Sequence, residues 1–311
     1  MNSLRALVYL ENSVDAFAIT QEQYQRLRDA LPEICFCQVT TDHQFEAQLP
    51  ECDIVITWKF KDRWYALAPQ LRRIFTPAAG KDWIAHTPYH QAVIVNGTFH
   101  CVLMTESLLG MMLFFNRRFS QLIDNKNKYI FDRNVQSAAP SLYGQHVLII
   151  GYGTIGTYAG TVLSSLGCTI SGVKRSLSSK KDTPAALYTF DTLPEIIGTA
   201  DHIITILPND SSTDAIITPD HFYRMKRSAF FYNIGRGNCY KEETLVHALD
   251  NEYIAGAGLD VFEKEPLPAN SRLWQMNNVF IMPHSSAICK PYLDFYIDEL
   301  VGILSSLHDT L

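Results

Sequence analysis

The fold is decided by residues 146–156, whose sequence is HVLIIGYGTIG. The first five residues form a short apolar run, which predicts a buried strand. Three glycines follow in a GxGxxG pattern, and apolar residues then recur at helical spacing up to Gly167, a residue suited to a helix end. A GxGxxG pattern placed between a buried strand and an amphipathic helix predicts a loop that binds a dinucleotide.

Each glycine of this loop, and the helix start that follows, has a specific structural role in binding a dinucleotide. Gly151 allows the tight turn, Gly153 lets a pyrophosphate approach the backbone, and Gly156 lets helix and strand pack closely. Thr154 and Ile155 begin the helix, whose N-terminus carries partial positive charge and favours phosphate groups. A tight strand–helix turn without a ligand is the alternative interpretation, and the surrounding strand and helix favour the dinucleotide.

The end of the next strand indicates which dinucleotide is bound. An NAD-specific site places a carboxylate about 20 residues after the glycines, where it holds the ribose hydroxyls. Here the strand 169–173 continues with Lys174, Arg175 and Ser176, without a carboxylate. Two cations and a hydroxyl suit a 2′-phosphate, although a solvated basic turn would have the same composition. We therefore expect NADP(H) to be preferred, with NAD(H) as a second cofactor.

Strands and helices alternate along the whole chain, which predicts α/β architecture with mainly parallel sheets. Two helices stand out: an apolar one from Met104 to Arg118, of a kind usually buried between domains, and a final one over Pro291–Leu307. Residues 124–140 are polar and poorly periodic, and we expect an exposed arm there. The other expected elements are strands at 6–10, 34–39, 53–57, 73–76, 92–96, 146–150, 169–173, 202–207, 229–234, 254–259 and 279–282, and a helix at 21–31.

Three polar residues follow predicted strands of the second half of the chain. Arg236 and Asp260 are 24 residues apart, and so are Asp260 and His284. Because the carboxyl ends of parallel strands meet at one sheet edge, where ligands bind, we expect the three side chains in one crevice. Glu265 follows Asp260 in a loop that can turn back towards His284.

These residue types suit reduction of a ketone by hydride. A histidine can donate a proton to the developing alkoxide, and a carboxylate orients the imidazole and favours its charged form. Arginine can bind a substrate carboxylate and polarise the carbonyl group, and Asp260 can accept a hydrogen bond from the nicotinamide carboxamide. Each residue taken alone could have a purely structural role, as a turn residue, a strand cap or a surface charge. Their convergence beside a dinucleotide loop favours an active site with Arg236, Glu265 and His284 as catalytic residues.

Composition excludes other classes of function. The net charge of −6 opposes general nucleic-acid binding, which needs a basic face. No signal peptide and no apolar run of membrane-spanning length are visible, and the seven scattered cysteines lack metal-ligand spacing. We therefore expect a cytoplasmic protein with reduced thiols, no metal site, and neither nucleic acid nor membrane as partner.

The motifs as a set resemble those of the D-isomer-specific 2-hydroxyacid dehydrogenases, particularly the NADPH-linked glyoxylate/hydroxypyruvate reductase branch. The resemblance covers the second half of the chain from end to end. The matching pieces are GYGTIG at 151–156, SLG at 165–167, LPND at 207–210, NIGRG at 233–237, GLDVFEKEPLP at 258–268 and PHSSA at 283–287.

This resemblance implies two doubly wound α/β domains, a Rossmann cofactor domain inserted into a flavodoxin-like substrate domain. On that basis we expect the substrate domain at 1–103 plus 286–311 and the dinucleotide-binding domain at 104–285. The activity implied is reduction of a small 2-oxo acid to the D-2-hydroxy acid, with Arg236 and His284 also contacting substrate. Further cofactor contacts are implied for Leu207, Pro208, Ile234, Gly235 and Ser286. Family members are commonly homodimers, and residues 117–140 are the candidate arm.

The first domain matches the family less well. Pro77 to Asp82 resembles the family's substrate loop, which implies that backbone N–H groups of Ala79 and Gly80 bind the substrate carboxylate. Lys81 is unusual in that loop. Trp58 and Lys59 follow a predicted strand, so either a place in the cleft or, for Trp58, a place in the core is consistent with the sequence.

Three other functions are left open by the sequence. A formate dehydrogenase shares the fold but typically has glutamine at the position of Glu265, and phosphite oxidation would suit the same three residues. From a different class, a dinucleotide-sensing module similar to the family's corepressor relatives would retain the cofactor loop. An intact Arg–Glu–His set favours the enzyme over the sensor.

Overall fold

The computed structural model describes residues 4–177 and 183–307 of the chain. Contacts divide the chain into two units, each with its own apolar core. The first unit comprises residues 1–100 and 288–311, and the second comprises residues 101–287. The second unit is thus inserted into the sequence of the first.

The first unit contains a five-stranded sheet in the order β2-β1-β3-β4-β5, in which all neighbouring strands are parallel. Its strands are β1 (Arg5–Tyr9), β2 (Cys35–Gln38), β3 (Ile54–Thr57), β4 (Arg73–Thr76) and β5 (Val93–Asn96). The central strand β3 is buried at every position, as expected for a parallel sheet covered on both faces. This strand order is flavodoxin-like and confirms the predicted fold.

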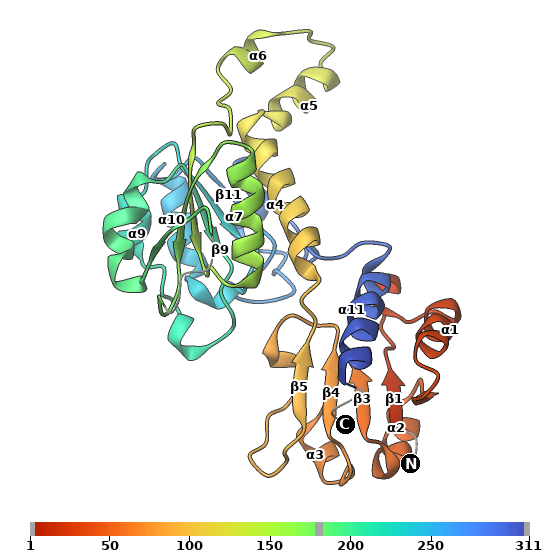
Figure 1. The fold of residues 1–311 in the computed structure, drawn as a ribbon. Helices are drawn as coiled ribbons and strands as arrows, with labels where there is room; N and C mark the ends of the chain where they lie inside the picture. Colours follow the sequence, from red (N-terminus) through yellow and green to blue (C-terminus); the bar gives the residue numbers. More distant parts are fainter. Residues whose placement is uncertain (1–3, 178–182, 308–311) are drawn as a thin grey trace. The chain divides into compact units, whose positions relative to one another are not determined.

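The helices of the first unit come from both ends of the chain. They are α1 (Gln21–Ala30), α2 (Asp42–Gln48), α3 (Asp62–Tyr65) and α11 (Tyr292–Leu307), with 3-10 turns η1 (Asp15–Phe17), η2 (Leu49–Glu51) and η3 (Lys81–Trp83). Thr20 and Gln23 form a capping box at the start of α1. Arg26 of α1 forms ion pairs with Asp294 and Asp298 of α11. The last helix therefore lies beside the first one in the same unit (Figure 1).

The second unit contains a seven-stranded parallel sheet in the order β12-β11-β10-β9-β6-β7-β8. Its strands are β6 (His146–Ile150), β7 (Thr169–Val173), β8 (Ala186–Tyr188), β9 (His202–Thr205), β10 (Phe230–Asn233), β11 (Gly256–Leu259) and β12 (Val279–Ile281). The order reverses between β6 and β9, which is the Rossmann topology predicted from the glycine loop. Strand β8 was not predicted, because its three partly exposed residues are too short to produce a pattern.

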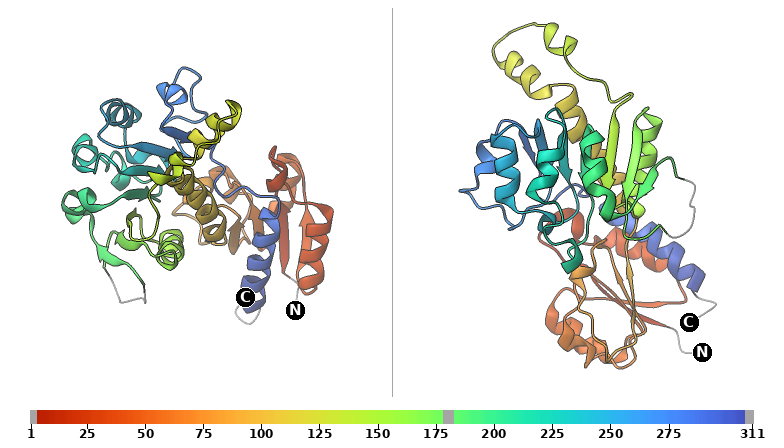
Figure 2. Two further views of the ribbon diagram at one scale, coloured as in Figure 1. Left: turned by 90° about the horizontal axis from the view of Figure 1, so that it is seen from above. Right: turned by 90° about the vertical axis from the view of Figure 1, so that its left-hand side faces the viewer.

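Helices cover both faces of this sheet (Figure 2). One face packs against α4 and α7, through residues such as Leu108 and Leu163, and the other against α9 and α10, through Phe222 and Leu245. The helices are α4 (His100–Asn116), α5 (Phe119–Asn127), α6 (Asn134–Ser137), α7 (Thr154–Ser165), α8 (Leu193–Ile196), α9 (Pro219–Arg224) and α10 (Glu242–Asp250). The 3-10 turns are η4 (Phe190–Thr192), η5 (Ile197–Thr199), η6 (Ser211–Thr213), η7 (Gly237–Cys239) and η8 (Arg272–Gln275).

The apolar helix α4 differs from its prediction. It begins four residues earlier, at His100, and it is buried on one side only. Leu108, Met111 and Met112 lie in the core of the second unit, whereas Val102 and Leu113 are exposed in the single chain. The sequence suggested burial all round because nearly every position is apolar, and that expectation was wrong for this exposed face.

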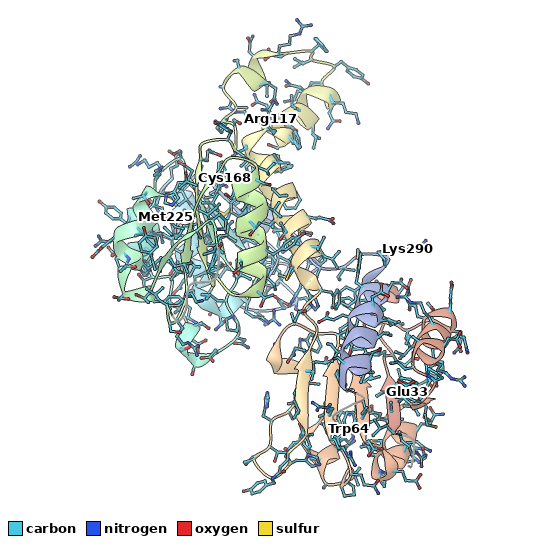
Figure 3. All side chains as sticks on the ribbon, viewed as in Figure 1. Glu33, Trp64, Arg117, Cys168, Met225 and Lys290 are labelled. Atoms are coloured by element: carbon cyan, nitrogen blue, oxygen red, sulfur yellow. The ribbon has the colours of Figure 1, made fainter. Side chains whose placement is uncertain are left out.

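The segment after α4 is exposed, as predicted, but part of it is helical. Arg117 directly follows α4, and the segment beyond it stands apart from the sheet (Figure 3). Short helices α5 and α6 occupy much of the segment that the sequence assigned to an irregular arm. Tyr129 and Phe131, between the two helices, have 98% and 89% of their surface exposed.

A polar network lies buried at the amino end of the central strands of the second unit. Tyr232 donates to Nδ1 of His202 (3.1 Å), and Nε2 of His202 donates to Gln145 (2.9 Å). Gln145 also accepts from the amide of Asn116, at the end of α4 (2.6 Å). Burial lowers the pKa of His202 from 6.5 to about 4, so this imidazole is neutral in the folded protein at neutral pH.

We expect the second unit to lose stability on mild acidification because of His202. Below pH 6.5 His202 is protonated in the unfolded chain, whereas in the folded chain it stays neutral down to about pH 4. The free energy of unfolding therefore decreases as the pH is lowered through this window. The loss should be about 2 kcal/mol between pH 7 and pH 5. Urea unfolding of the wild type and of His202→Gln at both pH values measures it. A drop of equal size in His202→Gln would contradict the assignment, and His247→Gln, which alters an exposed histidine of the same unit, is the control.

Candidate functional site

The carboxyl ends of β10, β11 and β12 deliver the three residues that the sequence singled out. These strands are adjacent and parallel, so their ends lie at one edge of the sheet. Arg236 follows β10, Asp260 follows β11 directly, and His284 follows β12. The structure therefore brings them to the same edge of the second unit.

His284 and Glu265 form a close pair. Nδ1 of His284 lies 2.7 Å from Oε2 of Glu265, and Oε1 of Glu265 accepts the backbone N–H of Phe262 (3.0 Å). The hydrogen bond to Glu265 raises the pKa of His284, although burial and the charge of Arg236 oppose it. Burial alone would raise the pKa of Glu265, but its bonds from His284 and Phe262 lower it. The pair therefore favours a charged imidazole beside a charged carboxylate.

Asp260 holds the backbone of the turn that carries His284. Its carboxylate accepts the N–H of Ser285 (2.6 Å) and, through both oxygens, that of Ser286 (3.1 Å). The N–H of His284 donates to the Asp260 carbonyl (2.8 Å). These bonds support His284 at φ 52°, a left-handed conformation that is unfavourable for a residue with a side chain. Sequence reasoning assigned Asp260 only to the cofactor and missed this second task, which has no sequence signal.

Arg236 lies in a loop fixed by the preceding asparagine. Asn233 accepts the N–H of Gly235 and donates to the carbonyl of Arg236, both at 3.0 Å. Gly237 packs against the next loop so closely that a Cβ there would lie 1.9 Å from the carbonyl oxygen of Phe262. The charge of Arg236 influences the pKa of both Glu265 and His284, which places the three groups within electrostatic reach. The positioning by Asn233 was not predicted.

The glycine loop has the geometry that a pyrophosphate needs. Gly151 has φ +99°, and a Cβ on Gly156 would meet the Gly151 carbonyl at 2.6 Å. A Cβ on Gly153, by contrast, would project into open space. No side chain caps α7, so the N–H groups of Thr154 and Ile155 at its first turn are not taken up by a capping residue. The loop therefore fits a dinucleotide phosphate at this helix end.

The loops on either side complete this edge of the sheet. Gly235 approaches the loop after β9 so closely that a Cβ would lie 2.5 Å from the N atom of Leu207, which brings Ile234 and Pro208 to the same place. After β7, Lys174 is half-buried, whereas Arg175 and Ser176 are exposed. Arg175 donates to the hydroxyl of Ser212 (2.9 Å).

A carboxylate near Arg175 was not predicted from the sequence. Asp210, in the loop after β9, lies 3.8 Å from the guanidinium of Arg175. The usual position of the acidic residue in NAD sites is the end of the strand that corresponds to β7, and Asp210 lies in a different loop. The register of β6 with β7 and β9 puts the two loops on opposite sides of the glycine loop, and no pattern within one loop signals this contact.

In the first unit, side chains donate hydrogen bonds to the carbonyl groups of the predicted substrate loop. The Asn96 amide donates to the carbonyls of Ala78 (3.1 Å) and Gly80 (3.0 Å), and the Tyr292 hydroxyl donates to that of Pro77 (3.4 Å). Within residues 4–177 and 183–307, the N–H groups of Ala79 and Gly80 have no protein acceptor. Such an arrangement presents N–H donors to an anion. Neither Asn96 nor Tyr292 was singled out from the sequence.

Trp58 belongs to the core of the first unit. Its exposed fraction is 8%, and its indole N–H donates to the carbonyl of Phe17 (2.8 Å). Its ring also lies against Tyr292. The hypothesis that Trp58 lines a substrate cleft is therefore wrong. Lys59 is exposed with its ammonium group 5.1 Å from the Trp83 ring, and the side chain of Lys81 lies outside the described part of the chain.

In the described residues no three His, Cys, Asp or Glu side chains come together in a way that would hold a metal ion. Among the helices that the structure describes, none combines the length and the apolar character needed to cross a membrane.

Residues 109–286 match the model of the D-isomer specific 2-hydroxyacid dehydrogenase NAD-binding domain. This match spans more than half of the chain and includes the glycine loop, Arg236, Glu265 and His284. The chain belongs to the D-isomer specific 2-hydroxyacid dehydrogenase family. Its second unit is the family's dinucleotide-binding domain.

Curated relatives agree with this membership. The chain is 31% identical to glyoxylate/hydroxypyruvate reductase B of Salmonella paratyphi C over 227 residues, which cover 70% of this chain and 68% of that one. It is 45% identical to a probable 2-ketogluconate reductase of Dictyostelium discoideum, but only over 92 residues. That match covers 30% of this chain and 28% of the relative.

Solved structures agree over almost the whole chain. A D-isomer specific 2-hydroxyacid dehydrogenase family protein from Aeromonas salmonicida has a TM-score of 0.80 and 26% identity, covering 98% of this chain and 94% of that one. The NADPH-dependent glyoxylate/hydroxypyruvate reductase of Sinorhizobium meliloti, solved with NADP and sulfate, has a TM-score of 0.79 and 24% identity. That alignment covers 97% of this chain and 95% of that one, and it shows a shared fold in both units.

The His284–Glu265 contact predicts a specific titration behaviour. Glu265→Gln removes the charged acceptor that raises the pKa of His284, so the imidazole should lose its proton at lower pH than in the wild type. NMR titration of the His284 ring nitrogens measures this. Glu263→Gln is a matched control, because Glu263 lies in the same loop but pairs with Lys241. An unchanged His284 titration in Glu265→Gln would show that the pair does not control this proton.

Proposed function

We propose that the chain reduces a small 2-oxo acid of the glyoxylate or hydroxypyruvate type to the D-2-hydroxy acid, with NADPH as the preferred cofactor and NADH as a second one. The observation that carries this proposal is the 2.7 Å His284–Glu265 pair at the sheet edge that also presents Arg236. The reductase names of the Salmonella and Sinorhizobium proteins support the choice of acid.

His284 is the proton donor in this mechanism. Its Nδ1 is engaged by Glu265, which leaves Nε2 for the carbonyl oxygen of the substrate. The hydrogen bond to Glu265 raises the pKa of His284, which favours the protonated imidazole that donates when negative charge develops on that oxygen. Asp260 fixes the orientation of the ring by holding the turn on which it stands. Bound NADPH supplies the hydride.

Each unit has a set of donors that suits an acid. Arg236 is a permanent cation with a forked donor group, so it can bind the substrate carboxylate and polarise the neighbouring carbonyl. In the first unit, the N–H groups of Ala79 and Gly80 are donors that suit a carboxylate.

The cofactor is held along the carboxyl edge of the second sheet. Gly151, Gly153 and Gly156 would leave room for the pyrophosphate, and the N–H groups of Thr154 and Ile155 would donate to it at the helix end. Lys174, Arg175 and Ser176 would hold the 2′-phosphate. Other residues at this edge that would contact the cofactor are Leu207, Pro208, Ile234 and Gly235, and Asp260 and Ser286 would contact its nicotinamide.

We propose that the active form is a homodimer joined through the arm at residues 117–140. This segment exposes a set of large apolar side chains that a single chain leaves uncovered: Phe119, Ile123, Tyr129, Ile130 and Phe131. An exposed apolar set of this size is typical of an interface.

Turnover of small 2-oxo acids tests the main proposal. We expect the purified protein to oxidise NADPH with glyoxylate or hydroxypyruvate faster than with bulkier 2-oxo acids. His284→Ala should reduce kcat by roughly 10²–10⁴, the usual contribution of general acid catalysis, while NADPH still binds. Steady-state absorbance assays measure both effects. Tight NADPH binding without turnover of any 2-oxo acid would favour a sensor, and NADP⁺ reduction by formate or phosphite would favour the other dehydrogenases.

The Asn96 contacts predict a separate effect on substrate binding. Asn96→Ser removes the amide donor that restrains the loop carbonyls, so the N–H groups of Ala79 and Gly80 should lose their alignment. We expect KM for the 2-oxo acid to rise about tenfold, the value of one net hydrogen bond, while the Kd of NADPH stays the same. Asn278→Ser, which removes a comparable amide–carbonyl bond in the second unit, is the control. An unchanged KM would exclude this loop from substrate binding.

A further inference from the structure

The carboxylate beside Arg175 is not used by the mechanism. The end of β7 carries no acidic residue, but Asp210 reaches the same place from the loop after β9. Strand β6 lies between β7 and β9, so the two loops flank the glycine loop from opposite sides. The cation predicted to bind the 2′-phosphate therefore has an acidic neighbour within 4 Å, at 3.8 Å.

Asp210 is held in place by the chain rather than left mobile. Its Oδ1 accepts both the N–H (2.8 Å) and the hydroxyl (2.7 Å) of Ser212, and its Oδ2 is the oxygen nearest Arg175. The hydrogen bonds from the Ser212 hydroxyl and N–H lower the pKa of Asp210, so it is ionised at neutral pH. Arg175 completes the group by donating to the same Ser212 hydroxyl (2.9 Å).

We propose that Asp210 is a cofactor-specificity residue that weakens NADPH and keeps NADH usable. This inference rests on the proposed dinucleotide function of the site. The two cofactors differ by the 2′-phosphate, which carries a charge of about −1.5 to −2 near pH 7 by analogy with phosphoamino acids. A fixed carboxylate beside the phosphate-binding cation repels that charge and competes for the guanidinium. NADH has no such charge and is not penalised.

The same carboxylate replaces the acidic residue that is missing from β7. In NAD sites an Asp or Glu at the end of that strand disfavours a 2′-phosphate and accepts from the ribose hydroxyls. Here the cations stand at the end of β7, and the carboxylate comes from the neighbouring loop. Because both charges are exposed, the effect is moderate and should decrease as salt is raised.

The test compares the binding of both cofactors without substrate. We expect Asp210→Asn, which keeps an oxygen for Ser212 but removes the charge, to tighten NADPH about three- to tenfold and to leave NADH unchanged or weaker. Arg175→Ala should weaken NADPH far more than NADH. Fluorescence titration of the full chain at low and high salt gives the four Kd values for each variant. Unchanged thermal melting shows that the variants are folded.

Asp214→Asn is the matched control, because this exposed carboxylate lies in the same loop but accepts from Asn238 instead of contacting Arg175. It should leave the NADPH-to-NADH ratio of Kd values unchanged. An unchanged ratio in Asp210→Asn, or a ratio shifted towards NADH, would overturn the inference. If the wild type binds neither cofactor, the dinucleotide function itself fails, which is a different result from an unaltered ratio.

Discussion

Parallel strand pairing is the constraint on which the rest of this structure depends. A parallel strand must be followed by a crossover before the next one, so every carboxyl end is delivered to the same edge of its sheet. In the second unit this edge collects the glycine loop, the cations after β7, and the loops that carry Arg236, Asp260 and His284. Residues more than a hundred positions apart therefore share one site without any local sequence relation.

The turn that carries His284 has an unfavourable backbone conformation. His284 adopts a positive φ, and the compensation comes from the Asp260 carbonyl and carboxylate, which accept three successive backbone N–H groups. Asp260 has an exposed fraction of 1%, so water does not compete for these bonds. Strain at His284 is thus balanced by the hydrogen bonds that the buried Asp260 accepts from the same turn.

The sequence was most informative where a pattern is local. Strands β6 and β7 were predicted with their observed bounds, because an apolar run is followed directly by a turn signal in each. The positions of Arg236, Glu265 and His284 followed from strand ends and from family resemblance. Their mutual geometry beyond a shared edge did not, since loop conformation depends on contacts such as that of Gly237 with Phe262.

What the sequence could not predict is mostly contact between loops or between distant elements. Asp210 meets Arg175 because β7 and β9 both pair with β6, so the loops that follow them lie near each other. Asn96 meets the loop at 77–80 because β4 and β5 are paired. Trp58 was ambiguous because a residue at a strand end can face the crevice or the core, and contact with Phe17 decides for the core. Strand β8 was too short to signal its presence.

The return of α11 to the first unit has a consequence for synthesis on the ribosome. Residues such as Leu293, Ile297, Leu300 and Leu304 are buried, so the first unit lacks part of its core until the last helix emerges. Residues 101–287 are complete before that point and can fold first. The strands synthesised first are therefore the last to reach their final packing. A nascent chain shortened within α11 would be vulnerable to proteolysis in its N-terminal part rather than in its middle.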